Sequence, residues 1–278
     1  MKQTHLKYVL IINHFGIHLG KIGPYFINTH YLYGSENEAV EFLNYIDYEK
    51  DKKIELPKKV FNKVYAQYKD NNIYREVIDD IVSFIKSHIN LNEVDYISGG
   101  ERRDWFFSNI VAYLLGKPHI TIFKDLSSVV STPDYKETFI KEDLNGKKVL
   151  HVADLVTEAS SYVRAWIPGI QALGAEIVWS VVVVDRMQGG NDRLRSLGID
   201  SYSLVQIAPD MFKTALESGI ISEKQSVMLN KFYIDPDGTM RTFLIEHPEF
   251  LEKALKSDEK TIVRARLCLE GDLYGLKK

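Results

Sequence analysis

The chain has 278 residues, of which 45% are hydrophobic and 26% are charged. These fractions are typical of a globular protein with a substantial core, and they exclude the disordered, collagen-like and disulfide-scaffold classes. The net charge is −3, from 35 basic and 38 acidic residues, so no overall positive field favours nucleic acid as a partner. At about 150 residues per domain, the length corresponds to one large α/β domain or two smaller ones.

Apolar stretches and cysteine content indicate the compartment. Uninterrupted apolar runs such as Tyr8–Ile12 and Val181–Val184 are far shorter than the roughly 18 residues that span a bilayer, and the first is too short for the core of a secretory signal. The single cysteine, Cys268, cannot form an internal disulfide and fits the role of a small buried apolar residue. We therefore expect a soluble cytoplasmic protein with no membrane partner.

The first half of the chain contains one strand–turn–helix unit. Apolar residues recur every four positions from Ile73 to Ile89, which predicts an amphipathic helix. Residues 94–97 then predict a short strand, and Ser98-Gly99-Gly100 predicts a turn after it. Helical spacing returns at 107–114, where a glycine and a proline supply the stop signal.

Strands and helices continue to alternate through the middle of the chain, which predicts a parallel sheet covered by helices on both faces. The valine-rich strand at 177–184 indicates a central position in that sheet. Pro168 lies inside a predicted helix, where it should kink or shorten the first turns. The other elements expected here are strands at 119–123 and 147–152, an irregular polar stretch at 124–144, a polar turn at 154–161 and a helix that ends near Leu173.

Two segments have the composition of additions to this core. Residues 48–69 are rich in lysine and tyrosine around Pro57. Residues 221–278 combine helical apolar spacing with a turn at Asp235–Gly238. We therefore assign residues 1–220 to one domain and the remainder to a helical C-terminal extension that packs on the same domain.

The polar turn after the strand at 147–152 is the first candidate binding site. In an open parallel sheet, ligands bind at the carboxyl ends of the strands, where loops lead into helix N-termini. Residues 154–161 place small hydroxyl groups and free backbone N–H groups at such a helix start, which suits a phosphate. A simple helix cap, in which Ser160 or Ser161 satisfies the backbone donors, fits the same residues equally well.

Three stretches of sequence form a longer pattern in chain order. They are His-Leu-Gly-Lys-Ile-Gly-Pro-Tyr-Phe-Ile-Asn at 18–28, Leu-Val-Thr-Glu-Ala-Ser-Ser at 155–161 behind a Val-Leu-His-Val strand, and Val-Val-Val-Val-Asp-Arg-Met-Gln-Gly-Gly at 181–190. Together with the segments at 144–149 and 198–199, this order resembles the orotate phosphoribosyltransferases of the type I phosphoribosyltransferase family. The resemblance runs from about residue 15 to residue 221.

The resemblance implies a fold, a reaction and an assembly. The fold is a twisted parallel sheet flanked by helices, with a small N-terminal hood near residues 1–48. The reaction is the Mg²⁺-dependent transfer of ribose 5-phosphate from phosphoribosyl pyrophosphate to a pyrimidine base such as orotate, and the assembly is a homodimer. Because pyrophosphate leaves as an oxocarbenium-like ribosyl centre develops, such a protein must hold two phosphate clusters and stabilise charge.

The same resemblance implies roles for individual residues. The turn Thr157–Ser161 would hold the 5-phosphate, and Asp154 would contact the ribose hydroxyls. The turn 98–103 would face the pyrophosphate, although its two arginines fit a solvated surface as well. The candidate catalytic residues are Lys124 and Asp154, Asp154 is also the candidate Mg²⁺ ligand, and the candidate substrate-binding residues are Lys21, Tyr25 and Phe26 of a base pocket, Gly99, Gly100, Arg102, Arg103, Thr157, Glu158, Ala159, Ser160, Ser161 and Arg186.

Three departures from the family pattern count against an ordinary orotate enzyme. The usual acidic pair at the strand end is Ala153-Asp154 here, so one carboxylate is missing. Glu158 puts a carboxylate beside the phosphate turn, where it repels a phosphate unless it points outward. Only Lys124 remains of the cationic residues that the family carries in and before its mobile lid, so the lid lacks its usual chemistry; Lys136 and Lys141 are candidate substitutes.

Two alternatives therefore stay open. A catalytically degenerate protein of the same fold would bind nucleotide or phosphoribosyl pyrophosphate as a sensor or regulator, and a purely structural protein is the third interpretation. Dinucleotide, hydrolase-elbow and P-loop motifs do not occur in the sequence. His14, His18 and His30 are more typical of surface or core histidines than of a metal site, and the aromatic residues at 63–74 favour packing over nucleic-acid stacking.

Overall fold

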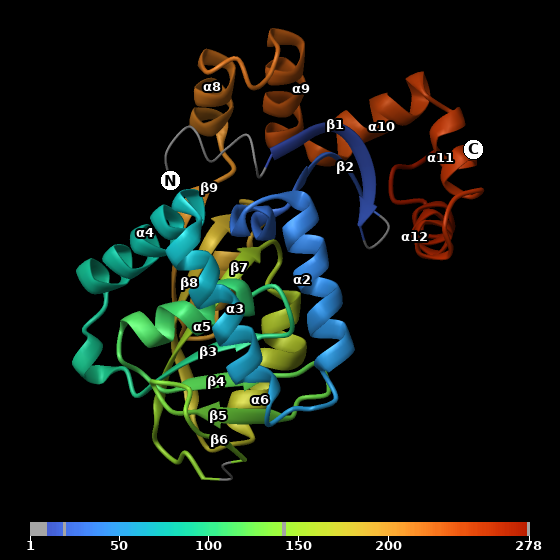
Figure 1. Ribbon diagram of the computed structural model, residues 1–278. Coiled ribbons are helices and arrows are strands. Elements are labelled where there is room, and N and C mark those ends of the chain that lie inside the picture. Colours follow the sequence, from blue (N-terminus) through green and yellow to red (C-terminus); the bar gives the residue numbers. More distant parts are fainter. Residues whose placement is uncertain (1–9, 19–20, 141–142, 277–278) are drawn as a thin grey trace. The chain divides into compact units, whose positions relative to one another are not determined.

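The computed structural model describes residues 10–18, 21–140 and 143–276, and these form two compact units. Unit 1 holds Thr29–Ile207 and contains the large sheet (Figure 1). Unit 2 joins the described residues before Thr29 to those from Ala208 onward. Within unit 2, two N-terminal strands pack with helices from the end of the chain. The assignment of residues 1–220 to one domain stays a prediction.

The sheet of unit 1 has the strand order β6-β5-β4-β3-β7-β8-β9. Five of these strands run parallel, whereas β5 and β6 add an antiparallel edge. The predicted parallel sheet flanked by helices is confirmed. Its strands are β3 (Tyr96–Gly100), β4 (His119–Ile122), β5 (Ser128–Ser131), β6 (Thr138–Phe139), β7 (Lys148–Val156), β8 (Glu176–Asp185) and β9 (Asp200–Gln206).

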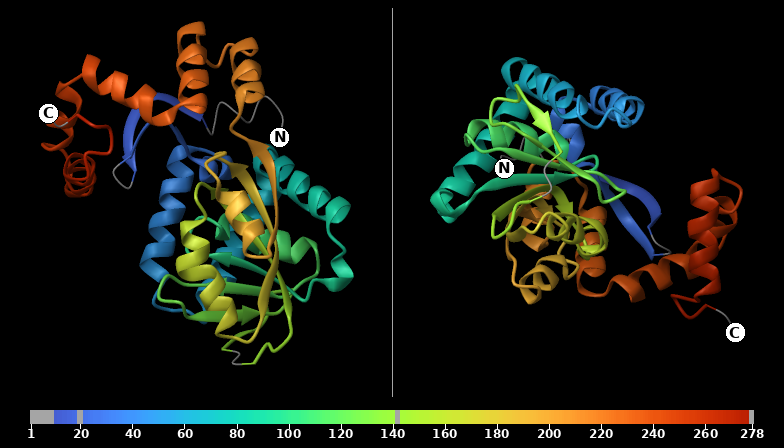
Figure 2. Two further views of the ribbon diagram at one scale, coloured as in Figure 1. Left: turned by 180° about the vertical axis from the view of Figure 1, so that it is seen from behind. Right: turned by 90° about the horizontal axis from the view of Figure 1, so that it is seen from below.

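Helices cover both faces of this sheet (Figure 2). Successive residues of a strand point to opposite faces. Gly99 faces Ser108 of α5, and Gly100 faces Trp166 in the helical segment after β7, so these two elements lie on opposite faces. The helical elements of unit 1 are η1 (Thr29–Tyr33), α2 (Glu36–Glu49), α3 (Leu56–Asp70), α4 (Asn72–His88), η2 (Leu91–Glu93), α5 (Trp105–Leu114), η3 (Tyr162–Trp166), α6 (Ile167–Gln171) and α7 (Gly190–Ser196).

Strong periodic signals in the sequence match the structure. The four-residue apolar spacing forms α4, in which Val77, Ile81 and Ile85 are buried. The valine run forms the middle of β8, where residues 181–184 are at most 1% exposed, as expected for a strand buried on both faces. The segment 48–69 is less of an addition than its composition suggests, because most of it forms α3, which packs against α5.

Two local predictions are wrong. Ser98-Gly99-Gly100 is not a turn but the last part of β3, since Gly99 and Gly100 pair with β4, and the turn follows at residues 101–104. The stretch 124–144 is not irregular throughout, because it contains β5 and β6. These strands are short, and one of them has only two residues, so they leave no clear alternation in the sequence.

The position of Pro168 has a structural explanation. The helical segment after β7 begins with a π-helical turn, η3, in which the Ile167 N–H donates to the Tyr162 carbonyl. Pro168 then occupies one of the first two positions of α6. A proline lacks the N–H that an α-helix interior uses, and it is tolerated at a helix start. The π-helical turn therefore ends just before Pro168, and a new α-helix begins there, so the proline interrupts no hydrogen bond of a helix interior.

Unit 2 combines an antiparallel hairpin with helices from the end of the chain. The Ile22 N–H donates to the Tyr274 hydroxyl at 2.6 Å, and the Tyr25 ring packs edge-on against Phe232. Cys268 is buried, as predicted. None of the helices among the described residues has the length and apolarity to cross a membrane. The elements of unit 2 are β1 (Leu10–His18), β2 (Lys21–Ile27), α8 (Pro209–Glu217), α9 (Glu223–Ile234), α10 (Pro236–Glu246), α11 (Glu249–Ala254) and α12 (Glu259–Glu270).

Candidate functional site

Two of the predicted turns meet at the carboxyl edge of the sheet in unit 1. β3 and β7 are neighbouring parallel strands, with Ser98 beside His151 in the register. The turn 101–104 follows β3, and the turn 157–159 follows β7. Because the carboxyl ends of parallel strands face the same side, the structure brings the predicted pyrophosphate turn next to the predicted phosphate turn.

The phosphate turn presents free donors. Thr157 is half-buried, Glu158 and Ser160 are exposed, and helical backbone begins at Ser160. Ala159 is buried with a φ of 55°, the left-handed region, which turns the chain sharply into the helix. Within the described residues, neither the Ser160 nor the Ser161 hydroxyl caps the helix by a hydrogen bond. The capping alternative therefore does not account for these serines.

The segment after β8 supports the phosphate turn from outside. A Cβ at Gly190 would lie 2.6 Å from the Thr157 carbonyl oxygen, so α7 begins directly against the turn. The Arg193 guanidinium donates to the Glu158 carbonyl at 3.2 Å. The Arg186 N–H donates to the Val156 carbonyl at 3.0 Å, so this predicted substrate-binding residue is placed beside the turn by its backbone.

Asp154 is a buried carboxyl group at the end of β7. Its Oδ2 accepts the Thr29 hydroxyl at 2.9 Å, and its Oδ1 accepts the Leu155 N–H. Burial and the neighbouring Asp104 carboxylate raise the pKa of Asp154 to about 7, while Arg103 and the hydrogen bonds oppose that rise. Asp154 therefore takes up a proton readily near neutral pH when no cation and no hydroxyl group of a ligand is bound to it.

Asp104 and Thr29 belong to this site although the sequence did not single them out. Asp104 stands at the N-cap position of α5 but makes no side-chain cap hydrogen bond. Its oxygens accept the Gly100 and Asp154 N–H groups instead, each at 3.0 Å. An aspartate between a strand and a helix was a usable signal, since this is a common capping position. No sequence pattern marks Thr29.

The two arginines of the pyrophosphate turn have different environments. The peptide bond that precedes Arg102 is cis, and the Arg102 guanidinium binds the Asp47 carboxylate and the Leu43 carbonyl. The Arg103 guanidinium forms no hydrogen bond or ion pair with any residue that the structure describes. Burial, together with the nearby Arg103 guanidinium, lowers the pKa of His30 to about 3. Arg103 is therefore the cation of this turn that is available to an anionic ligand.

Lys124 is held by the same turn. Its N–H donates to the Glu101 carboxylate at 3.0 Å, and its Nζ lies 3.7 Å from the other oxygen. The side chain is 66% exposed, so the ion pair leaves it free to exchange partners.

The connection that would form a lid is a tight turn. Between β4 and β5 the Phe123 N–H donates to the Ser127 carbonyl at 2.9 Å. Lys53 binds the Asp125 carboxylate and the Ser127 hydroxyl, which ties the turn to the segment before α3. Lys136 pairs with Asp134 at 2.8 Å, and Lys141 lies outside the described residues.

The proposed base-pocket residues belong to β2 in unit 2. Lys21 is exposed and lies 3.9 Å from the Asp237 carboxylate, whereas Tyr25 is buried in its own unit. Phe26 is half-buried. Their role in a base pocket stays a prediction. His30 is a buried core residue as expected, and the side chains of His14 and His18 lie outside the described part.

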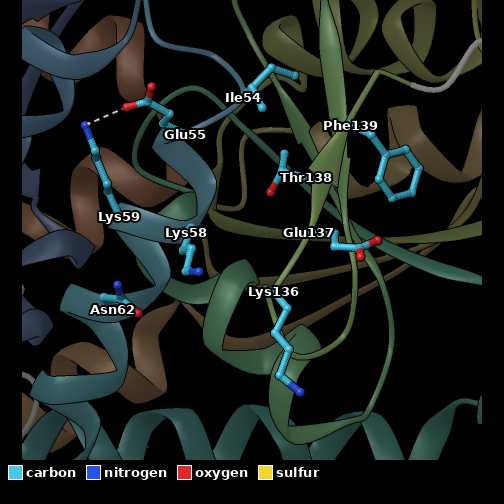
Figure 3. Close-up of a pocket in the computed structure, with 9 residues that line it drawn as sticks. All are labelled: Ile54, Glu55, Lys58, Lys59, Asn62, Lys136, Glu137, Thr138 and Phe139. Atoms are coloured by element: carbon cyan, nitrogen blue, oxygen red, sulfur yellow. Dashed lines mark ion pairs between the residues drawn. The ribbon is translucent and has the colours of Figure 1, made fainter.

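A pocket of about 640 Å³ lies elsewhere in unit 1 (Figure 3). It opens between the start of α3 and the edge strand β6, and Lys136 is among its residues. No other candidate residue lines it, and its Lys58 makes no ion pair among the described residues. Its lining residues are Ile54, Glu55, Lys58, Lys59, Asn62, Lys136, Glu137, Thr138 and Phe139.

Comparison with known proteins gives several phosphoribosyltransferases as sequence relatives. No family model matches the chain. Orotate phosphoribosyltransferase of Sulfolobus acidocaldarius is 23% identical over 164 residues, which cover 59% of this chain and 77% of that protein. Adenine phosphoribosyltransferase of Pseudomonas aeruginosa is 25% identical over 165 residues, covering 55% and 88%.

Solved structures share the fold. Orotate phosphoribosyltransferase from Aeropyrum pernix superposes with a TM-score of 0.52 at 15% identity, over 80% of this chain and 100% of that one. UMP synthase of Leishmania donovani gives a TM-score of 0.57 at 18% identity over 83% of this chain, which spans only 41% of that protein. In sequence and in fold the chain is therefore similar to orotate phosphoribosyltransferases and related phosphoribosyltransferases.

Proposed function

We propose that unit 1 binds phosphoribosyl pyrophosphate at the carboxyl edge of β3 and β7, and that the protein transfers the ribose 5-phosphate to a nucleobase. One observation carries the proposal: the turn Thr157–Ser161 offers uncapped hydroxyl and N–H groups at a helix start, beside Asp154 and Arg103. The names of the relatives include orotate and adenine enzymes, and the motif at 18–28 favours a pyrimidine such as orotate.

The residues suggest a division of labour. The backbone N–H groups of 157–161 would hold the 5-phosphate, because the positive end of the helix dipole attracts it. Asp154 would accept hydrogen bonds from the ribose hydroxyls. Arg103 would pair with the pyrophosphate and stabilise the charge that grows as it leaves. No covalent nucleophile is needed.

The residues of this site would bind Mg²⁺ only together with the ligand, whose phosphates would provide most of the contacts to the ion. Among the described residues, no group of three or more histidine, cysteine, aspartate or glutamate side chains could enclose a metal ion. Mg²⁺ commonly keeps several waters and binds one or two carboxylates together with substrate phosphates. Asp154 would supply such a carboxylate, and the ion would neutralise phosphate charge.

A second candidate function is supported by the turn between β4 and β5. Lys53 ties that turn to the segment before α3, and Lys124 is paired with Glu101. A site without a mobile cationic lid binds phosphates through its ground-state contacts but stabilises the leaving group poorly. On this reading the protein binds phosphoribosyl pyrophosphate or a nucleotide as a sensor or regulator.

Titration calorimetry with phosphoribosyl pyrophosphate and Mg²⁺, followed by turnover assays with orotate and adenine, tests both candidates. Replacement of Thr157 and Ser161 by alanine should weaken binding about tenfold or more, whereas Thr214→Ala on α8 should not change it. Binding with turnover supports the transferase, and binding without turnover supports the sensor. If the wild-type protein does not bind the ligand at all, both candidates are wrong.

A further inference from the structure

Asp104 connects the two halves of the candidate site. Its Oδ2 accepts the Gly100 N–H at the end of β3, and its Oδ1 accepts the Asp154 N–H near the end of β7. The side chain is only 6% exposed. The buried Asp104 carboxylate therefore links the end of β3, which leads into the predicted pyrophosphate turn, to Asp154, the predicted ribose-binding residue.

The carboxylate has further support from beneath. The His151 Nε2 lies 3.4 Å from Asp104 Oδ2, and the other ring nitrogen of His151 is 2.8 Å from the Ser98 hydroxyl. Ser98 and His151 are both fully buried, so neither reaches a ligand. The His151 ring lies behind Asp104 without a hydrogen bond from its Nε2, and the contact of its other nitrogen with Ser98 fixes where the ring lies.

The arrangement is costly for a purely structural role. Asp104 and Asp154 are both buried, and the Asp104 carboxylate contributes to the raised pKa of Asp154. A neutral serine or asparagine would cap α5 without that repulsion. Asp104 makes no cap hydrogen bond to α5 and uses its two oxygens on the backbone near the carboxyl ends of β3 and β7.

On these grounds we infer that Asp104 is a positioning residue, which holds the Asp154 and Gly100 backbone in the geometry that binds the ribose of a phosphorylated ribose ligand. The inference rests on the proposed function for its ligand class. We assign Asp104 no contact with the ligand, because its side chain is almost completely buried.

A double-mutant cycle tests this role. Asp104→Asn keeps the shape but replaces one accepting oxygen by an amino group. Its affinity for ribose 5-phosphate should fall about tenfold, while its affinity for inorganic phosphate, which needs only the turn 157–161, should stay within about twofold. In an Asp154→Asn background, the further loss for ribose 5-phosphate should shrink to less than about twofold. Equal losses for both ligands, or in both backgrounds, would overturn the inference.

Amide hydrogen exchange gives a second test that needs no ligand. In the wild-type protein the Gly100 and Asp154 N–H groups should both be protected, and Asp104→Asn should speed the exchange of at least one of them. Asp95 provides a matched control, because its carboxylate accepts the Lys148 N–H at 2.9 Å at the opposite end of the same strands. Asp95→Asn should speed exchange only there.

These outcomes separate the two hypotheses. Failure of the wild-type protein to bind any phosphorylated ribose, with normal protection of both amides, would refute the proposed function and the ligand class attached to it. Rapid exchange of Gly100 or Asp154 in the wild-type protein would refute the positioning role even if the ligand binds. If Asp104→Asn does not fold, amide exchange of Gly100 and Asp154 in the wild-type protein still tests the positioning role.

Discussion

The indole ring of Trp166 lies directly against Gly100, so that a Cβ at position 100 would overlap the ring. Gly100 ends β3, and Trp166 belongs to the helical segment that begins at the phosphate turn. Because Gly100 has no side chain, the helical segment that contains Trp166 can pack closely against the end of β3.

Gly100→Ala should destabilise the protein by about 1–3 kcal/mol, since the ring must move out of a packed core. Trp166→Leu in the same chain should restore part of that loss by making room. Chemical denaturation of the two single variants and the double variant measures the coupling. Additive losses would show that the contact does not limit this position.

Asp154 makes stability depend on pH in an unusual direction. Its pKa is raised from 3.8 to about 7, so the folded chain holds this proton more tightly than the unfolded chain does. Its contribution to stability is full below pH 3.8 and is lost as the pH rises towards 7. Asp154→Asn should remove this dependence and be more stable than the wild type at pH 8 by at least about 1 kcal/mol.

Denaturation curves of both proteins at several pH values give the difference directly. A constant difference from pH 4 to pH 8 would contradict the raised pKa. The same variant should lose affinity for ribose 5-phosphate, so stability and ligand binding would change in opposite directions, as is common for functional carboxylates.

Arg102 and Arg103 should respond differently to truncation. Arg103→Ala should weaken phosphoribosyl pyrophosphate binding about tenfold or more with little change in stability, because the Arg103 side chain makes no hydrogen bond or ion pair in the described part of the chain. Arg102→Ala should chiefly lower the melting temperature, since it breaks the contacts to Asp47 and Leu43. If both variants keep full affinity, the turn after β3 is not the pyrophosphate site.

Lys53 should control the turn between β4 and β5. The Lys53 amine and the Ser127 hydroxyl lower the pKa of Asp125 to about 2. Lys53→Ala should move that pKa back towards 3.8, which NMR titration of the carboxyl carbon can follow. The cost in stability should stay below about 1 kcal/mol, because the Asp125 side chain is 59% exposed and solvent screens the pair. Protease cleavage near residue 125 should become faster.

Local patterns were enough to predict α4, β8 and the phosphate turn, because each depends on the spacing of neighbouring side chains. Gly99 and Gly100 were misread as a turn, since their place in β3 depends on Ser108 and Trp166, which no local pattern reveals. The bond from Asp104 to Asp154 spans 50 positions, and the bond from Ile22 to Tyr274 spans 252. Contacts of that kind appear only once the chain has folded.

The π-helical turn at 162–166 has a consequence for how this chain tolerates deletions. The Tyr162 hydroxyl bonds Ser180 at 2.7 Å on one side of the widened turn, and Trp166 meets Gly100 on the other. Removing one exposed residue between them, such as Arg164, would convert the turn to regular α-helix and rotate all that follows by about 100°. Tyr162 and Trp166 could then not both keep their contacts. The extra residue of the π-helical turn therefore lets Tyr162 reach Ser180 while Trp166 packs against Gly100.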